Sequence, residues 1–197
     1  MRSERIWYTA RPTKEEKYLT DPLFFDTDCL SAFLWVGHES LLEKLYPGRV
    51  VIPKSVYDEL SVPGIAHLKR RVDTMLQAGT ASVMQIDYGT PEYLLYRKLT
   101  SDPEPGHHII GRGEAAAIAL AKSQDGILAS NNLKDISVYV TEWNLQHVTT
   151  GDVLFAAYQK GFIDEAQGNV LWANMLAKRR RLGYGSFSDY LRNKSNR

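Results

Sequence analysis

Apolar residues along the chain form short continuous runs, separated by longer stretches in which they recur every three to four positions. The runs at 23–25, 50–52 and 127–129 have the length and the polar or turn boundaries typical of buried strands. Residues 81–86 and 147–149 predict two further strands. Helical spacing predicts helices over 30–45 (with Asp28 as a candidate cap), 54–60, 65–78, 91–99, 115–123, from about 132, 151–160, 164–180 and 187–191.

Strands that alternate with helices indicate crossover connections, and therefore a parallel sheet covered on both faces. We expect an α/β protein with three layers, α/β/α, around a central, mostly parallel sheet, and with extra helices at its C-terminal end. The expected organisation is an N-terminal extension at 1–21, a main domain at 22–160 with an irregular, partly helical insert at 61–106, and a helical extension at 161–197 that carries a basic cluster.

Composition narrows the classes of protein that remain. The chain has 24 Lys and Arg against 23 Asp and Glu, so any affinity for nucleic acid must come from a local patch. Its single cysteine, Cys29, excludes an internal disulfide and a Cys-rich zinc site, and is expected to be a small buried hydrophobic residue. No apolar run approaches the roughly 18 residues of a membrane span, and the first residues lack the apolar centre of a signal peptide. We therefore expect a cytoplasmic protein.

Four acidic residues, Asp26, Glu59, Glu114 and Asp135, occupy comparable places in this pattern. Asp26 ends a strand, Glu59 lies in the helix after a strand, and the other two lie in the first turns of helices. In an open parallel sheet, the carboxyl ends of strands and the starts of helices face one crevice. Carboxylates that share a pocket repel one another unless a divalent cation lies between them. Oxygen ligands without Cys or His favour Mg²⁺ or Mn²⁺, which can activate water for attack on a phosphodiester.

Each acid also has a purely structural explanation. The segment 26–28 can cap a helix, and Glu114 in a first turn is favoured by the helix dipole. Asn132 and Asp135 have the spacing of a capping box, and Glu59 can be a solvated side chain. Taken one at a time, these explanations are preferred, but their joint placement at strand ends favours a site.

Four motifs together resemble the PIN domain family: Phe25-Asp-Thr-Asp-Cys-Leu30, Ile52-Pro53 with Asp58-Glu-Leu60, Gly113-Glu followed by an Ala-rich helix, and Ala129-Ser-Asn-Asn-Leu-Lys-Asp135. The family includes VapC-like toxin ribonucleases. The resemblance implies a metal-dependent endoribonuclease, often homodimeric, and in toxin–antitoxin pairs a small antitoxin partner. It places Asp26, Glu59, Glu114 and Asp135 as catalytic and metal-binding residues, with Ser130 and Asn132 supporting them.

Basic residues supply candidate contacts to an RNA substrate. The densest cluster is Lys178, Arg179, Arg180 and Arg181, and Arg112 and Lys134 adjoin the acidic motifs. The cluster is equally typical of a solvated helix end, where the helix dipole favours cations.

Other interpretations remain beside the nuclease. Many PIN domains carry Asp where this chain has Asn132, which motivates a catalytically degenerate module that binds RNA or protein. DNA is a further possible substrate. Residues 111–116 match a dinucleotide-binding pattern, but they lack the preceding strand and would place Glu114 beside a pyrophosphate. His107 and His108 point apart if extended, so a polar loop pair is preferred over a metal site.

Overall fold

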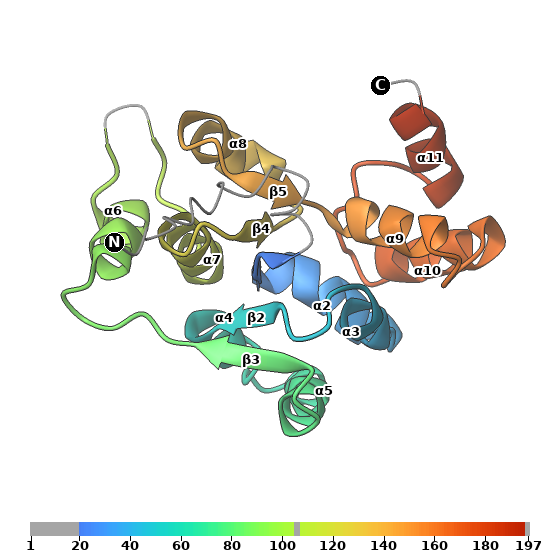
Figure 1. Ribbon diagram of the computed structural model, residues 1–197, viewed down its shortest axis with the longest axis horizontal. Coiled ribbons are helices and arrows are strands. Elements are labelled where there is room, and N and C mark those ends of the chain that lie inside the picture. Colours follow the sequence, from blue (N-terminus) through green and yellow to red (C-terminus); the bar gives the residue numbers. More distant parts are fainter. Residues whose placement is uncertain (1–19, 105–106, 196–197) are drawn as a thin grey trace, which may run out of the picture.

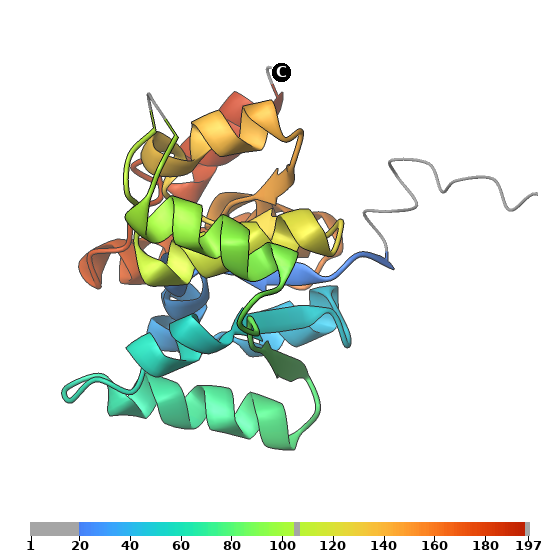
Figure 2. The same ribbon diagram turned by 90° about the vertical axis from the view of Figure 1, so that its left-hand side faces the viewer.

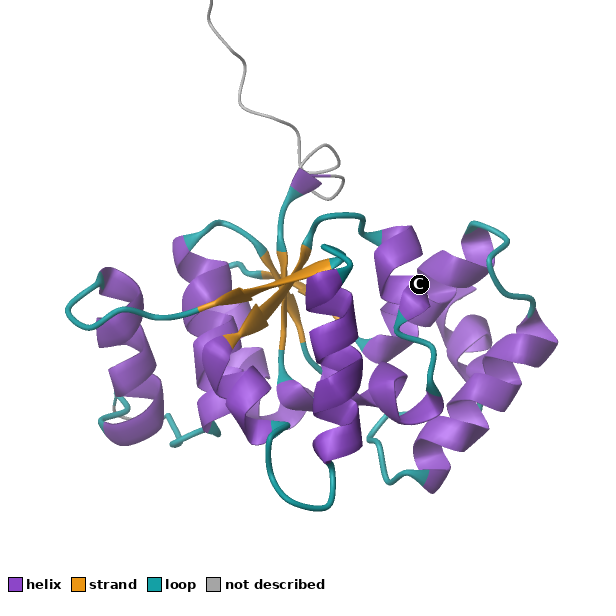
Figure 3. Ribbon diagram, turned by 90° about the horizontal axis from the view of Figure 1, so that it is seen from below, coloured by secondary structure: helices purple, strands orange, loops and turns teal. Residues whose placement is uncertain are grey.

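The computed structural model describes residues 20–104 and 107–195, and the expected extension at 1–21 lies almost wholly outside them. Five parallel strands form one sheet in the order β3-β2-β1-β4-β5. The strands are β1 (Leu23–Phe25), β2 (Val50–Pro53), β3 (Ala81–Met84), β4 (Ile127–Ala129) and β5 (Gln146–Val148). The expected three-layer α/β/α architecture is confirmed, and Figure 3 shows the strands at its centre with helices on both sides.

Ten helices accompany the sheet within the described residues. They are α2 (Thr27–Val36), α3 (Ser40–Leu45), α4 (Lys54–Glu59), α5 (Ala66–Gln77), α6 (Pro91–Ser101), α7 (Arg112–Ser123), α8 (Leu133–Glu142), α9 (Thr150–Gln159), α10 (Glu165–Ala177) and α11 (Phe187–Ser195). No helix in this part of the chain is long and apolar enough to cross a membrane.

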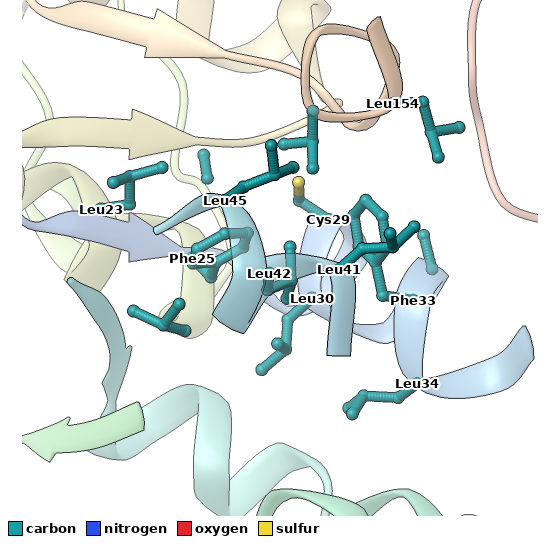
Figure 4. Close-up of a cluster of buried hydrophobic side chains, with 14 of the residues drawn as sticks. Leu23, Phe25, Cys29, Leu30, Phe33, Leu34, Leu41, Leu42, Leu45 and Leu154 are labelled. Carbon is teal, nitrogen blue, oxygen red and sulfur yellow. The ribbon is translucent and has the colours of Figure 1, made fainter. Parts of the chain in front are cut away.

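Two hydrophobic cores form because successive strand residues point to opposite faces of the sheet. Leu23 and Phe25 face α2, α3, α9 and α10, whereas Phe24 between them faces α6, α7 and α8. Figure 2 shows α6 and α7 lying across the second face. Cys29 lies fully buried in the first core, among the side chains drawn in Figure 4, as its expected hydrophobic role requires.

The strand order creates a point at which the chain reverses direction across the sheet. From β1 the chain adds β2 and β3 on one side, and then crosses to add β4 and β5 on the other (Figure 1). The crevice outside the carboxyl ends of β1 and β4 is therefore a topological switch point, which is where open α/β sheets bind ligands. Asp26 follows β1, and Ser130 follows β4.

The structure corrects the expected helix over 30–45. Gly37 adopts a left-handed conformation (φ 71°) and its N–H group closes α2 on Leu34, so the apolar pattern continues in a separate helix, α3. The cap of α2 is also different from the expected one. Asp26, rather than Asp28, accepts the hydrogen bond from the N–H group of Cys29.

The insert at 61–106 and the C-terminal helices complete the sheet and one of its faces. Residues 61–106 contain α5, β3 and α6, and β3 pairs along its length with β2. At the other end of the chain, α10 packs against α2, and α11 packs against α9 and α10 (Figure 1). Arg180, in the segment between α10 and α11, reaches back to Asp28 of α2.

Candidate active site

Asp26 lies at the centre of the site, immediately after β1. Its N–H group donates to the carbonyl of Ala129 at 2.9 Å, which ties it to the end of β4. Its Oδ1 accepts the N–H group of Cys29 at 2.7 Å. Oδ2 is buried and has no hydrogen-bond partner among the residues that the structure describes. The side chain is 1% exposed, so this oxygen is shielded from water, and Ser130 is the side-chain donor that acts on the carboxyl.

Burial is the main cause of raised pKa values at Asp26 and Glu114. It raises the pKa of Asp26 to about 7, although Ser130 and the Cys29 N–H group act in the opposite direction, and the charge of Glu114 adds to the rise. Burial also raises the pKa of Glu114, and the charges of Asp135 and Asp28 raise it further. The charged forms of both carboxyls are therefore disfavoured by neighbouring carboxylates, which is the situation that a bound cation relieves.

Asn132 connects Asp135 to the pair formed by Asp26 and Glu114. Its Nδ2 donates to Oδ2 of Asp135 at 2.7 Å, and its side chain also hydrogen bonds Glu114, which lowers the pKa of that carboxyl. The backbone N–H group of Asn132 is bound by Oγ of Ser130 at 3.3 Å. A capping box is not formed, since the side chain of Asn132 accepts no cap hydrogen bond at the start of α8. The amide therefore bridges two carboxylates.

Glu59 is held in a different way from Asp26. Its Oε1 accepts the N–H group of Gly113 at 2.9 Å, and its Oε2 accepts the hydroxyl of Thr27. A Cβ atom on Gly113 would lie 2.6 Å from the Thr27 hydroxyl and 2.9 Å from Oε2 of Glu59. Only glycine leaves room for this clamp, which joins α4, α7 and the first turn of α2.

These residues surround an open cavity of about 400 Å³ at the switch point, called here the acidic cavity. Arginines from the segment after α10 form another part of its wall, and Arg180 binds Asp28 Oδ1 at 2.9 Å. A negative floor beside a positive wall suits a ligand that combines cations with phosphate groups. The lining residues are Asp26, Thr27, Asp28, Glu59, Gly111, Gly113, Glu114, Asn132, Arg179, Arg180 and Arg181.

The acidic cavity offers oxygen ligands of the kind that bind a divalent cation. Within the described residues, no three His, Cys, Asp or Glu side chains form a ready-made metal cage. Mg²⁺, however, is usually bound through one or two carboxylates together with water and substrate phosphates. Asp26, with its unsatisfied Oδ2, and Glu114 beside it match that mode. Glu59 already uses both oxygens in its clamp, and Asp135 reaches the pair through Asn132.

Other expected contact residues lie at varying distances from the acidic cavity. Arg112 opens α7 between two glycines that line it. Lys134 is exposed in the first turn of α8. Lys178 lies with its amine 5.2 Å from the centre of the Trp35 ring. His107 stacks on Tyr139 and lies 3.2 Å from Glu142, in keeping with a polar loop residue.

Two residues of the site had no role in the sequence-based set beyond a helix cap. Asp28 faces the acidic cavity and carries the ion pair with Arg180, and Thr27 holds Glu59. The Asp-Thr-Asp motif places Asp28 in the first turn of the helix that Asp26 caps, which is a usable signal. The hydroxyl of Thr27 meets Glu59 across 32 positions of the chain, and no spacing in the sequence indicates that contact.

Comparison with known proteins agrees with this geometry. A family model described as a PIN domain matches residues 23–195, which is most of the chain. No curated protein and no solved structure shows significant similarity to it. The chain belongs to the PIN domain family, whose members are typically nucleases and generally use divalent metal ions.

Proposed function

We propose that this protein is a metal-dependent endoribonuclease that hydrolyses RNA phosphodiester bonds in the acidic cavity. One observation carries the proposal: Asp26, a buried carboxyl at the switch point of the sheet, has an oxygen without a hydrogen-bond partner in the described structure and lines the acidic cavity together with Glu114. An arrangement that destabilises the apoprotein is typical of a functional rather than a structural residue.

In this proposal, Asp26 and Glu114 hold Mg²⁺ or Mn²⁺ through carboxylate oxygens. The bound ion would supply an activated water and neutralise charge on the phosphate. Asn132 keeps Glu114 and Asp135 apart and oriented through its amide, and Ser130 fixes the backbone of Asn132. Asp135 adds negative charge that strengthens cation binding without contacting the first pair directly.

Two groups of residues position the substrate and the acids. Glu59, held by Thr27 and Gly113, keeps α4, α7 and the start of α2 in register around Asp26. Arg179 and Arg181 on the wall of the acidic cavity provide phosphate contacts, and Arg180 anchors their segment to Asp28. Arg112, Lys134 and Lys178 extend the basic surface available to a longer RNA.

The test is cleavage of a fluorescently labelled single-stranded RNA in Mn²⁺. Replacing Asp26 with Asn keeps the size and the oxygen that caps α2, and we expect it to lower the cleavage rate by more than about a hundredfold. Glu43→Gln, which changes an exposed acid of α3 outside the acidic cavity, is the control and should cleave at nearly the wild-type rate. Undiminished, Mn²⁺-dependent cleavage by Asp26→Asn would refute the assignment.

A second function, a catalytically degenerate module that binds RNA or a protein, is favoured by two features. An amide, Asn132, occupies a site position, and the described acids form no ready-made metal cage. This alternative predicts RNA binding by the wild type without measurable Mn²⁺ binding. The nuclease proposal predicts both.

The resemblance to toxin ribonucleases extends the proposal to growth control by RNA cleavage, with a small antitoxin protein that covers the acidic cavity, and to a homodimer. Expression of the wild-type chain should then slow bacterial growth, while Asp26→Asn at equal soluble level should not. Equal growth of both strains would separate the nuclease from the toxin role.

A further inference from the structure

Glu59 also lines a second cavity, of about 450 Å³, formed by α4, the segment after β3, α6 and α7. We call it the tyrosine cavity; it is lined among others by Lys54, Gln85, Tyr93, Tyr96 and Arg112. Arg112 lines this cavity, whereas its chain neighbours on both sides line the acidic cavity. The two cavities therefore meet at the start of α7, and one extended ligand can occupy both.

Aromatic rings dominate one wall of the tyrosine cavity. Tyr93 and Tyr96 are three residues apart on α6 and so lie on one face of that helix. Tyr88, in the loop before α6, lies outside the lining of the cavity and extends its aromatic wall, with its ring centre 4.8 Å from that of Tyr93. Tyr88 is 87% exposed, so its ring presents an open face to solvent. Thr90 caps α6 by accepting the N–H group of Tyr93 at 3.2 Å, which fixes the turn that carries these rings.

A cation with no assigned protein partner lies at the other wall. The guanidinium of Arg112 makes no ion pair or hydrogen bond with any residue in the described part of the chain, while its backbone carbonyl accepts the Ser55 hydroxyl at 3.4 Å. Lys54 is paired with Asp58, but both side chains are about half exposed, and such a pair contributes little. Both cations are therefore available to a phosphate.

We propose that the tyrosine cavity binds an unpaired nucleotide of single-stranded RNA next to the phosphodiester in the acidic cavity. The base stacks on the tyrosine rings and its phosphate contacts Arg112. Stacking accepts every base, because each has a π face, whereas bases inside a duplex are not available to stack on protein. The placement of this nucleotide next to the reacting phosphate rests on the proposed function. The stacking of its base on the tyrosine rings needs no metal.

The test is equilibrium binding of a labelled single-stranded RNA in EDTA, where no metal-dependent cleavage occurs. Tyr88→Leu and Tyr93→Leu should each weaken binding roughly tenfold, because each removes a stacking face. Tyr88→Phe and Tyr93→Phe keep the ring and should bind like the wild type. Tyr158→Leu, which removes a partly exposed tyrosine from α9, is the matched control and should have no effect. The same RNA annealed to its complement should bind more weakly than the single strand.

Arg112 gives an independent readout. Arg112→Gln should weaken binding at low salt and should reduce the slope of log affinity against log salt by about 1, as expected when one phosphate contact is lost. Tyr88→Leu should leave that slope unchanged.

The outcomes separate this inference from the proposed function. Equal affinity of the wild type and the two Leu variants, equal binding of the duplex, or no binding of single-stranded RNA would overturn the tyrosine site. In Mn²⁺, the Leu variants should raise the KM for RNA and keep kcat, unlike Asp26→Asn. Tyrosine-dependent binding in a wild type that cleaves no RNA would support the tyrosine site and overturn the nuclease alone.

Discussion

Two aspartates near helix N-termini, the buried Asp26 and the partly buried Asp152, have opposite surroundings. Asp26 caps α2 with one oxygen and leaves the other without a partner in the described structure. Asp152 belongs to the capping box of α9, and all its acceptor positions are used. Its Oδ2 accepts the N–H group and hydroxyl of Thr149, and its Oδ1 accepts the hydroxyl of Tyr190 and the amine of Lys194.

The protonation equilibria differ accordingly. Burial raises the pKa of both carboxyls, and for Asp26 it prevails and brings the pKa to about 7. For Asp152, hydrogen bonds from Lys194, Thr149 and Tyr190 outweigh burial and lower the pKa to about 2. Saturation by donors and shallower burial together distinguish the carboxylate of Asp152, which stabilises the fold, from that of Asp26, which is available for chemistry.

The largest expected effect concerns Asp26 in the metal-free protein. Because its folded-state pKa lies above the ordinary value of 3.8, the folded state retains a proton that the unfolded state has lost. The free energy of unfolding should therefore fall by about 4 kcal/mol as pH rises from 4 to 8. Asp26→Asn should abolish most of that fall and be the more stable protein at pH 8. Urea unfolding in EDTA between pH 4 and 8 measures the free energy of unfolding of the wild type and of Asp26→Asn. The same dependence on pH in both proteins would contradict the comparison.

Asp152 should behave with the opposite sign. Its carboxylate should contribute about 2 kcal/mol of stability above pH 4, which is lost as pH falls through 2. We expect Asp152→Asn to lose a similar amount at pH 7 and to unfold with a weaker dependence on acid, because Lys194 and Tyr190 of α11 lose a charged partner. Asp58→Asn serves as the exposed control. If Asp152→Asn is as stable as the wild type at pH 7, the carboxylate of Asp152 does not stabilise the fold.

Glu59 extends the comparison to a third carboxylate, whose two oxygens each accept one hydrogen bond, from Thr27 and from Gly113. Gly113→Ala inserts a methyl group 2.6 Å from the Thr27 hydroxyl and should lower the free energy of unfolding by about 2 kcal/mol. Gly111→Ala is a close control, since its Cβ would meet only Oε2 of Glu114, at 3.9 Å. Thermal melts of the two variants test the clamp. Equal melting temperatures would show that Glu59 is not held as described.

The smallest effect is expected at the ion pair between Arg180 and Asp28, whose side chains are partly exposed. Arg180→Met should cost about 1 kcal/mol of stability or less. It should also tighten Mn²⁺ binding a few-fold, because Asp28 then acts on the site without a counter-charge. Lys178→Met, at a cation that lies over Trp35, should change neither quantity. Weaker Mn²⁺ binding by Arg180→Met would mean that the arginine orders the acids instead of screening them.

Local patterns in the sequence predict much of the fold. The apolar runs locate β1, β2 and β4, and strand–helix alternation predicts a parallel sheet whose strand ends bring Asp26 and Glu114 together. The break at Gly37 was missed, because helical spacing continues across it into α3. One glycine in a left-handed conformation ends a helix without disturbing the apolar period.

The hydrogen bonding of each acid could not be predicted from the sequence in the same way. Whether a carboxylate is saturated depends on donors that are distant in sequence, such as Thr27 for Glu59 and Lys194 for Asp152. Likewise, the arginine cluster lines the acidic cavity beside contacts from Arg180 to Asp28 and Ser31, about 150 positions away along the chain. Residue type and spacing locate candidate acids, and tertiary contacts decide which of them keep a free oxygen.

Calorimetric titration of the metal-free protein with Mn²⁺ tests the central claim most directly. The account predicts binding to the wild type and to Asp152→Asn, at a pH where both are folded, and loss of binding in Asp26→Asn. Binding that survives in Asp26→Asn, or absence of binding in the wild type, would contradict the assignment of the unsatisfied carboxylate as the metal ligand.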